Sequence, residues 1–191
     1  MIRTKRVVLQ WLLGCFITLP LTGTAASLIF VGESIQFHIL DSLCEVTAEY
    51  HFLNPTEEAI TTRLQYPFPV AKDHPFPTRI EVRAPGEAKL LPLLKNQTGV
   101  SFLLEMTPTS EKVIRVQYQQ KTSKRRFEYI LTSTQAWDRS LDWAIYQVVL
   151  PKRLELQTCS LIWDSKSEAG QDVIYSIKRE SFLPEQNFEI K

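Results

Sequence analysis

Residues 35–54, with the sequence IQFHILDSLCEVTAEYHFLN, decide the fold. Apolar residues occupy every second position on both sides of Asp41-Ser42. A period of two is typical of strands with one buried and one solvated face. If Asp41 and Ser42 form a tight turn, Ile39 faces Cys44, and every further inward residue meets another inward residue. The stretch therefore predicts a β-hairpin with Cys44 in the core.

The same pattern continues toward the C-terminus, and clusters of Pro, Gly, Asn and Asp interrupt it. No window between the hairpin and Tyr118 shows a sustained period of 3.6 residues, so a helical fold is disfavoured. About ten or eleven short strands at this spacing predict an all-β, two-sheet antiparallel β-sandwich of about ten strands. The further expected strands are residues 60–66, 79–84, 90–94, 100–106, 113–118, 127–131, 141–150, 159–163 and 173–177, and residues 188–190 are expected to be a tail.

The composition suits one globular domain and argues against disorder and against a protein with many membrane spans. The chain has 191 residues, of which 44% are hydrophobic and 23% charged. Its net charge of +1 lacks the one-sided positive field of a nucleic-acid binder, so nucleic acid is not an expected partner. No repeat or Gly/Ser-rich linker divides the chain.

The N-terminus has the pattern of a secretory signal peptide. Arg3, Lys5 and Arg6 precede an apolar run, and Thr24-Ala25-Ala26 offers small residues for cleavage before Ser27. We expect residues 1–26 to be removed and residues 27–191 to form the exported domain, periplasmic or secreted. The leader holds three basic and no acidic residues, so its removal takes the net charge from +1 to −2.

Two other interpretations of this segment remain open. Leu12-Leu13-Gly14-Cys15 is similar to a lipoprotein processing box. Alternatively, residues 7–31 could stay uncleaved as a membrane anchor, although polar residues and Pro20 interrupt that run. All three interpretations place the domain outside the cytoplasm, and a membrane is an expected partner only through an uncleaved N-terminal segment.

Removal of the leader leaves two cysteines, Cys44 and Cys159. An even count in an oxidising compartment permits a disulfide bond between them, which we predict. Such a bond would stabilise the fold by about 4 to 5 kcal/mol in the chain-entropy model. The alternative is two buried free thiols, because sequence says nothing about the distance between the residues.

A resemblance supports the sandwich. The segment Val46 to Asn54, followed by a turn, a strand and Tyr66-Pro67-Phe68-Pro69, resembles the opening of the vault/inter-alpha-trypsin (VIT) type of β-sandwich and of related exported bacterial domains of unknown function. Phe127 to Thr132 with Trp137 is similar to the middle of those exported domains. The resemblance implies a sandwich outside the cytoplasm and supplies no catalytic residue.

Catalytic signatures are missing from the sequence, which has no G-x-S-x-G, S-x-x-K or H-E-x-x-H motif and no phosphate loop. His38 should face Glu45, and His51 lies about 20 Å further along the hairpin at 3.3 Å per residue, so the two histidines cannot share a metal ion. His74 is expected to be a solvated loop residue beside Asp73. We predict no catalytic residue, cofactor or metal site.

Two features could contact a partner. Lys121, Lys124, Arg125 and Arg126 place four cations at an expected hairpin tip, which could meet anionic lipid, a glycan or an acidic protein, or serve only as a solvated turn. Trp137 lies in a polar loop and is a candidate ligand contact, whereas the strand phases of the other late tryptophans, Trp143 and Trp163, indicate core positions.

These observations predict a non-enzymatic binding or interaction module of the cell envelope, with a protein or another envelope component as its expected partner. One alternative is an envelope enzyme with a loop-built site from residues such as His74, Asp73 and Asp138. Three polar groups converging in one pocket would favour that enzyme. The other alternative is a structural component that pairs through a sheet edge, which an edge strand of five or more residues without proline or inward charge would favour.

Overall fold

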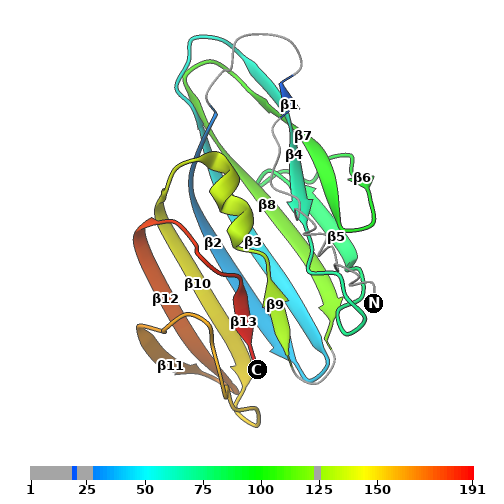
Figure 1. Cartoon of the computed structure of the whole chain (residues 1–191), viewed down its shortest axis with the longest axis vertical. Coiled ribbons are helices and arrows are strands. Elements are labelled where there is room, and N and C mark those ends of the chain that lie inside the picture. Colours follow the sequence, from blue (N-terminus) through cyan, green and yellow to red (C-terminus); the bar gives the residue numbers. More distant parts are fainter. Residues whose placement is uncertain (1–18, 21–27, 123–125) are drawn as a thin grey trace, which may run out of the picture.

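The computed structural model describes residues 19–20, 28–122 and 126–191, and they form an all-β sandwich (Figure 1). One 3₁₀ helix, η1 (Thr132–Trp137), interrupts the strands. The strands are β1 (Leu19–Pro20), β2 (Ile29–Leu40), β3 (Leu43–Asn54), β4 (Ile60–Pro67), β5 (Thr78–Arg83), β6 (Leu94–Lys95), β7 (Gly99–Met106), β8 (Ser110–Lys121), β9 (Phe127–Tyr129), β10 (Leu141–Pro151), β11 (Ser165–Ala169), β12 (Asp172–Phe182) and β13 (Phe188–Ile190). The predicted fold class is confirmed.

The main layer is a seven-stranded sheet in the order β11-β12-β10-β2-β3-β8-β5. Its centre is the predicted hairpin of β2 and β3, in which Ile39 pairs with Cys44, as expected from a two-residue turn. The inward residues of β3, from Cys44 to Asn54, are buried at every second position. Period-two alternation therefore predicted both the register and the buried face of this hairpin.

One pair of this sheet is parallel, which the sequence did not predict. β10 runs parallel to β2, with Tyr146 opposite Ile35 and Val148 opposite Phe37. Between β8 and β10 the chain passes through β9 and η1, and β10 then enters the sheet running in the same direction as β2. Parallel strands need a long crossover connection, and the segment with β9 and η1 is that connection here.

The second layer is divided into two smaller sheets. β1-β4-β7-β6 form one, and β13-β9 form the other. Figure 1 shows β9, β13 and the coiled ribbon of η1 over the face of the large sheet, with β4, β7 and β6 to one side. Phe37 of β2 contacts Phe127 and Phe188, so β9 and β13 pack directly on the large sheet.

Two segments depart from the strand prediction. Residues 159–163 form no strand and make only a bridge from Cys159 to Ile190, whereas residues 165–169, which lie between two predicted strands, form β11. Of residues 90–94, only Leu94 belongs to a strand, β6. Alternating apolar residues report side-chain direction, but a strand also needs a backbone partner, which these segments lack over most of their length.

The predicted disulfide bond between Cys44 and Cys159 is absent, because both residues are free thiols in the structure. Cys44 lies between Ile39 and Gln120 inside the large sheet. Cys159 pairs instead with Ile190 of β13, in the other layer. The pattern correctly placed Cys44 inward but held no information on which strand Cys159 would join.

The predicted leader, residues 1–26, lies outside the described residues except for β1, so its cleavage stays a prediction. No helix within residues 28–122 and 126–191 is long and apolar enough to cross a membrane.

Candidate functional site

A pocket of about 450 Å³ opens between the large sheet and the β9-β13 pair. Its walls come from the inward faces of strands and from the loop that follows β10. The residues that line it are Ile39, Asp41, Thr122, Phe127, Val148, Leu150, Arg153, Leu154, Glu155, Leu156, Gln157, Ile190 and Lys191. The apolar members form the interior wall, because Val148, Leu150 and Ile190 belong to the buried core.

The loop after β10 builds the outer wall. The Leu154 N–H donates to the Pro151 carbonyl oxygen at 2.8 Å, which turns the chain at the end of the strand. The Gln157 N–H then donates to the Lys191 carbonyl oxygen at 2.7 Å, which fixes the loop to the segment after β13. Leu154 and Leu156 are therefore held against the pocket by main-chain hydrogen bonds.

Charged groups lie at the mouth of the pocket rather than inside it. The Arg153 guanidinium pairs with the Asp41 carboxylate at 2.9 Å, and both side chains are more than 60% exposed. An ion pair this exposed contributes less than about 1 kcal/mol. Glu155 and Lys191 add one charge of each sign. The mouth is thus electrically balanced.

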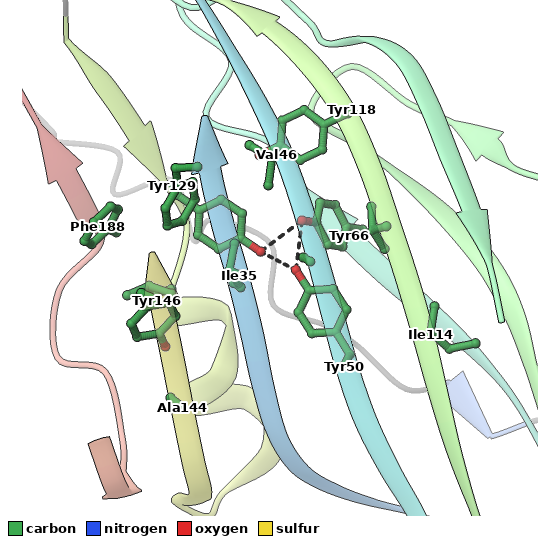
Figure 2. Close-up of a cluster of buried hydrophobic side chains, with 14 of the residues drawn as sticks. Ile35, Val46, Tyr50, Tyr66, Ile114, Tyr118, Tyr129, Ala144, Tyr146 and Phe188 are labelled. Carbon is green, nitrogen blue, oxygen red and sulfur yellow. Dashed lines mark hydrogen bonds between the residues drawn. The ribbon is translucent and has the colours of Figure 1, made fainter. Parts of the chain in front are cut away.

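A second polar feature, a triad of tyrosine hydroxyls, lies deep in the core (Figure 2). Tyr50 donates to Tyr66 at 2.9 Å, Tyr66 and Tyr129 are 2.9 Å apart, and Tyr50 and Tyr129 are also hydrogen-bonded. The three residues come from β3, β4 and β9, one from each sheet. The triad therefore joins the three sheets at one point.

Glu33 is buried beside this triad. It lies opposite Tyr50 in the β2-β3 register, and its carboxylate accepts a hydrogen bond from the Tyr146 hydroxyl at 2.5 Å. Burial raises the pKa of Glu33 from 4.5 to about 7, and the bond from Tyr146 offsets part of this rise. Burial also raises the pKa of Tyr50, Tyr129 and Tyr146 well above the usual value.

This buried cluster is unsuited to nucleophilic chemistry. A tyrosine needs a lowered pKa to act as a nucleophile, and burial moves the pKa of these hydroxyls upward.

The sequence analysis missed Glu33, although the alternation of the strand indicates its position. Glu33 lies an even number of residues before the inward residues Ile35, Phe37 and Ile39, so its side chain points to the same face. The pocket had no comparable signal, since its walls come from segments far apart in sequence.

The predicted ligand contact Trp137 packs into the sandwich instead of pointing outward. Its ring lies 5.5 Å from that of Phe30 and 5.7 Å from that of Phe52. Its indole N–H is buried and has no hydrogen-bond partner among the described residues. Trp163 is 39% exposed and packs edge-on against Tyr175, and Trp143 packs against His51, so neither lies in the core.

The basic tip is only partly described. Lys121 is exposed, while Lys124 and Arg125 lie outside the described residues. Arg126 forms an ion pair with Glu189 of β13 at 2.7 Å, so this cation is engaged within the domain. Thr122 and Phe127, which flank the segment outside the described residues, line the pocket.

The residues named for a loop-built enzyme site, His74, Asp73 and Asp138, do not meet in the pocket. His74, expected to be solvated, is buried, and its Nε2 bonds to the Arg126 carbonyl oxygen at 2.9 Å. Asp138 follows η1 and, like His74 and Asp73, does not line the pocket. In the described part of the chain, no three His, Cys, Asp or Glu side chains gather closely enough to hold a metal ion.

No family model and no curated protein matches the chain. Solved structures with the same fold include a "putative nutrient binding protein" from Legionella pneumophila, with a TM-score of 0.68 and 13% identity over 91% of this chain and 68% of that chain. An M1 zinc metallopeptidase from Deinococcus radiodurans has a TM-score of 0.53 and 10% identity, and the match spans 86% of this chain but 42% of the metallopeptidase. At these identities the likeness shows the fold alone.

Proposed function

We propose that this domain is a binding module that takes a small, largely apolar ligand in the pocket between β10, β9 and β13. The pocket itself carries the proposal, because its volume of about 450 Å³ lies within the range of ligand sites, about 300 to 1,000 Å³. In keeping with the predicted leader, the module would act outside the cytoplasm.

The lining favours binding over catalysis. The partly buried Ile39, Leu154 and Leu156 offer apolar surface, while the charges at the mouth are paired or balanced. A charge on the ligand would find partners only at the mouth, at the Asp41–Arg153 pair, Glu155 or Lys191, and would be left unpaired against the interior wall. We therefore propose an apolar body with one uncharged polar end, directed toward the mouth.

The Legionella pneumophila protein with this fold is described as a nutrient binder, and this description is compatible with the proposal. The proposal rests on this chain's own pocket, since the two chains share only 13% identity.

Fluorescence titration with N-phenyl-1-naphthylamine, an uncharged apolar probe, tests the proposal. We expect saturable binding of one probe per chain. Leu154→Trp, which places a larger ring at the pocket wall, should weaken binding at least tenfold. Leu94→Trp is the matched control, because Leu94 is 61% exposed and does not line the pocket.

Equal affinity in the two variants, or no saturable binding by the unmodified domain, would overturn the pocket assignment. Circular dichroism and thermal unfolding of each variant show whether the fold is retained.

A further inference from the structure

The outermost strands of the large sheet are protected against pairing with another chain. In β11, Lys166 and Glu168 lie opposite Tyr175 and Val173, so both charges are on the inner face of the edge strand. The Lys166 ammonium lies 5.2 Å from the centre of the Tyr175 ring, and Glu168 pairs with Lys152. An inward charge on an edge strand opposes the docking of a further strand.

The opposite edge, β5, is also blocked. Arg79 has a φ of 51°, and the pairing of β5 with β8 shifts register between Thr78 and Glu81. The Leu91 N–H then donates to the Val82 carbonyl oxygen at 2.7 Å, which covers the middle of the strand. Neither end of the large sheet therefore offers a regular free edge.

Covering groups also occupy the outer edges of β7 and β13. β6 pairs with β7 at Val100 and Ser101, and the Lys112 ammonium donates to the Glu105 carbonyl oxygen at 2.8 Å. On β13, the Ser160 N–H donates to the Glu189 carbonyl oxygen at 2.9 Å.

β4 differs from these strands. It has eight residues, its inward side chains are Ile60, Thr62, Leu64 and Tyr66, none of them charged, and its only proline is the last residue. On the side away from β7, the sole strand that pairs with it in the described part of the chain is the two-residue β1. Residues 60–66 of β4 thus meet the sequence criterion of five or more residues without proline or inward charge.

The pairing of β1 shows how this edge receives a backbone. Leu19 lies opposite Arg63, and Pro20 lies opposite Thr62, in antiparallel register. Pro20 has no N–H, so the residue of β1 that can donate a main-chain hydrogen bond to β4 is Leu19. Its partner Arg63 therefore points its own N–H toward β1. Every second residue of a strand points its N–H to the same side, so the N–H of Gln65 also faces this open edge. Thr61 and Gln65, whose main-chain groups face the same edge as those of Arg63, are not paired with β1.

We propose that β4 is a strand-acceptor edge that binds an extended peptide segment with apolar side chains at alternate positions. Leu19 and Pro20 belong to the predicted leader, so export would vacate the positions that β1 fills. The incoming strand pairs antiparallel to β4 through main-chain hydrogen bonds, and its side chains set specificity. This site is independent of the pocket, which no β4 residue lines.

The test uses the chain as a bacterial host exports it, with its N-terminus determined by intact mass. The probe is a fluorescein-labelled peptide of residues 16–22, which contains the β1 pair. We expect saturable binding by fluorescence anisotropy. N-methylation of Leu19 should weaken binding at least tenfold. N-methylation of Thr18 should leave binding unchanged, because successive N–H groups of a bound extended peptide point to opposite sides.

A chain variant supplies the second measurement. Gln65→Pro removes a main-chain donor from the open edge while the pairing with β7 persists, and Gln65→Thr keeps the donor as the matched control. The proposal expects at least tenfold weaker binding in Gln65→Pro only. Equal effects of the two N-methylated peptides, no saturable binding, or an exported chain that retains Leu19 and Pro20 would each overturn it.

Discussion

Glu33 is a carboxyl group in the core, opposite Tyr50 and hydrogen-bonded to Tyr146. Its pKa of about 7 in the folded chain exceeds the 4.5 of an unperturbed carboxyl. The folded state therefore holds a proton that the unfolded state releases between these values. The resulting stabilisation is complete below pH 4.5 and is lost as the pH rises through about 7.

Glu33→Gln should remove this pH dependence. In the unmodified chain, the shift from 4.5 to about 7 corresponds to a fall of about 3 kcal/mol in the free energy of unfolding between pH 4.5 and 8. The glutamine amide cannot ionise, so the free energy of unfolding of the variant should not show the decrease of about 3 kcal/mol that ionisation of Glu33 causes. Urea unfolding at a series of pH values measures it, with the exposed Glu57→Gln as control. Parallel pH profiles for Glu33→Gln and the unmodified chain would contradict the account.

The tyrosine triad predicts a contrast between two similar substitutions. Tyr129→Phe removes hydrogen bonds to both Tyr50 and Tyr66, and should lower the free energy of unfolding by about 1 to 3 kcal/mol. The Tyr118 hydroxyl is buried and has no hydrogen-bond partner among the described residues, so Tyr118→Phe should cost less than about 0.5 kcal/mol. Chemical denaturation compares them, and equal losses would show that the triad does not stabilise the fold.

At the scale of the element, Gly32 allows β10 to lie beside β2. A Cβ atom at this position would lie 2.5 Å from the Trp143 ring and 2.7 Å from the Trp143 carbonyl oxygen. The register of β2 and β3 also shifts between Phe30 and Gly32. The parallel pair thus depends on close backbone approach at a single glycine.

Gly32→Ala should therefore destabilise the domain by about 1 to 3 kcal/mol, because the backbone contact cannot relax without moving β10. Ser34→Ala, two residues along the same strand, should change stability by less than about 0.5 kcal/mol. Thermal unfolding of both variants checks the prediction. A Gly32→Ala protein as stable as Ser34→Ala would refute the close-approach argument.

Elements whose partners are neighbours in sequence could be predicted, and elements whose partners are distant could not. Asp41 and Ser42 fix the β2-β3 register, because a two-residue turn leaves one way to match inward faces. Cys159 instead joins Ile190, and β10 joins β2 in parallel, by contacts between distant segments that carry no local signal.

At the scale of the whole molecule, the sandwich and its binding pocket have different origins. Alternation predicts the layers, since each strand must bury one face. The pocket forms where the loop after β10 contacts the segment after β13. The periodicity of the sequence does not predict this contact, because the two segments are far apart in the chain. Strand patterns therefore predicted the fold and the inward cysteine, but neither the pocket nor the split of the second layer.

The domain has another apolar surface, which serves as an internal reference. Ile162 is 81% exposed and Leu183 is 42% exposed, and Leu183 lines a second hollow with Leu161 and Phe182. Non-specific association of an apolar probe would involve this surface, whereas the proposed pocket is formed by other residues.

Amide chemical shifts recorded during titration with N-phenyl-1-naphthylamine test the proposed function most directly. The account predicts saturable changes at Ile39, Val148 and Ile190 and none at Ile162 or Leu183. Changes centred on Ile162 and Leu183, or no saturable change at the pocket residues, would contradict it.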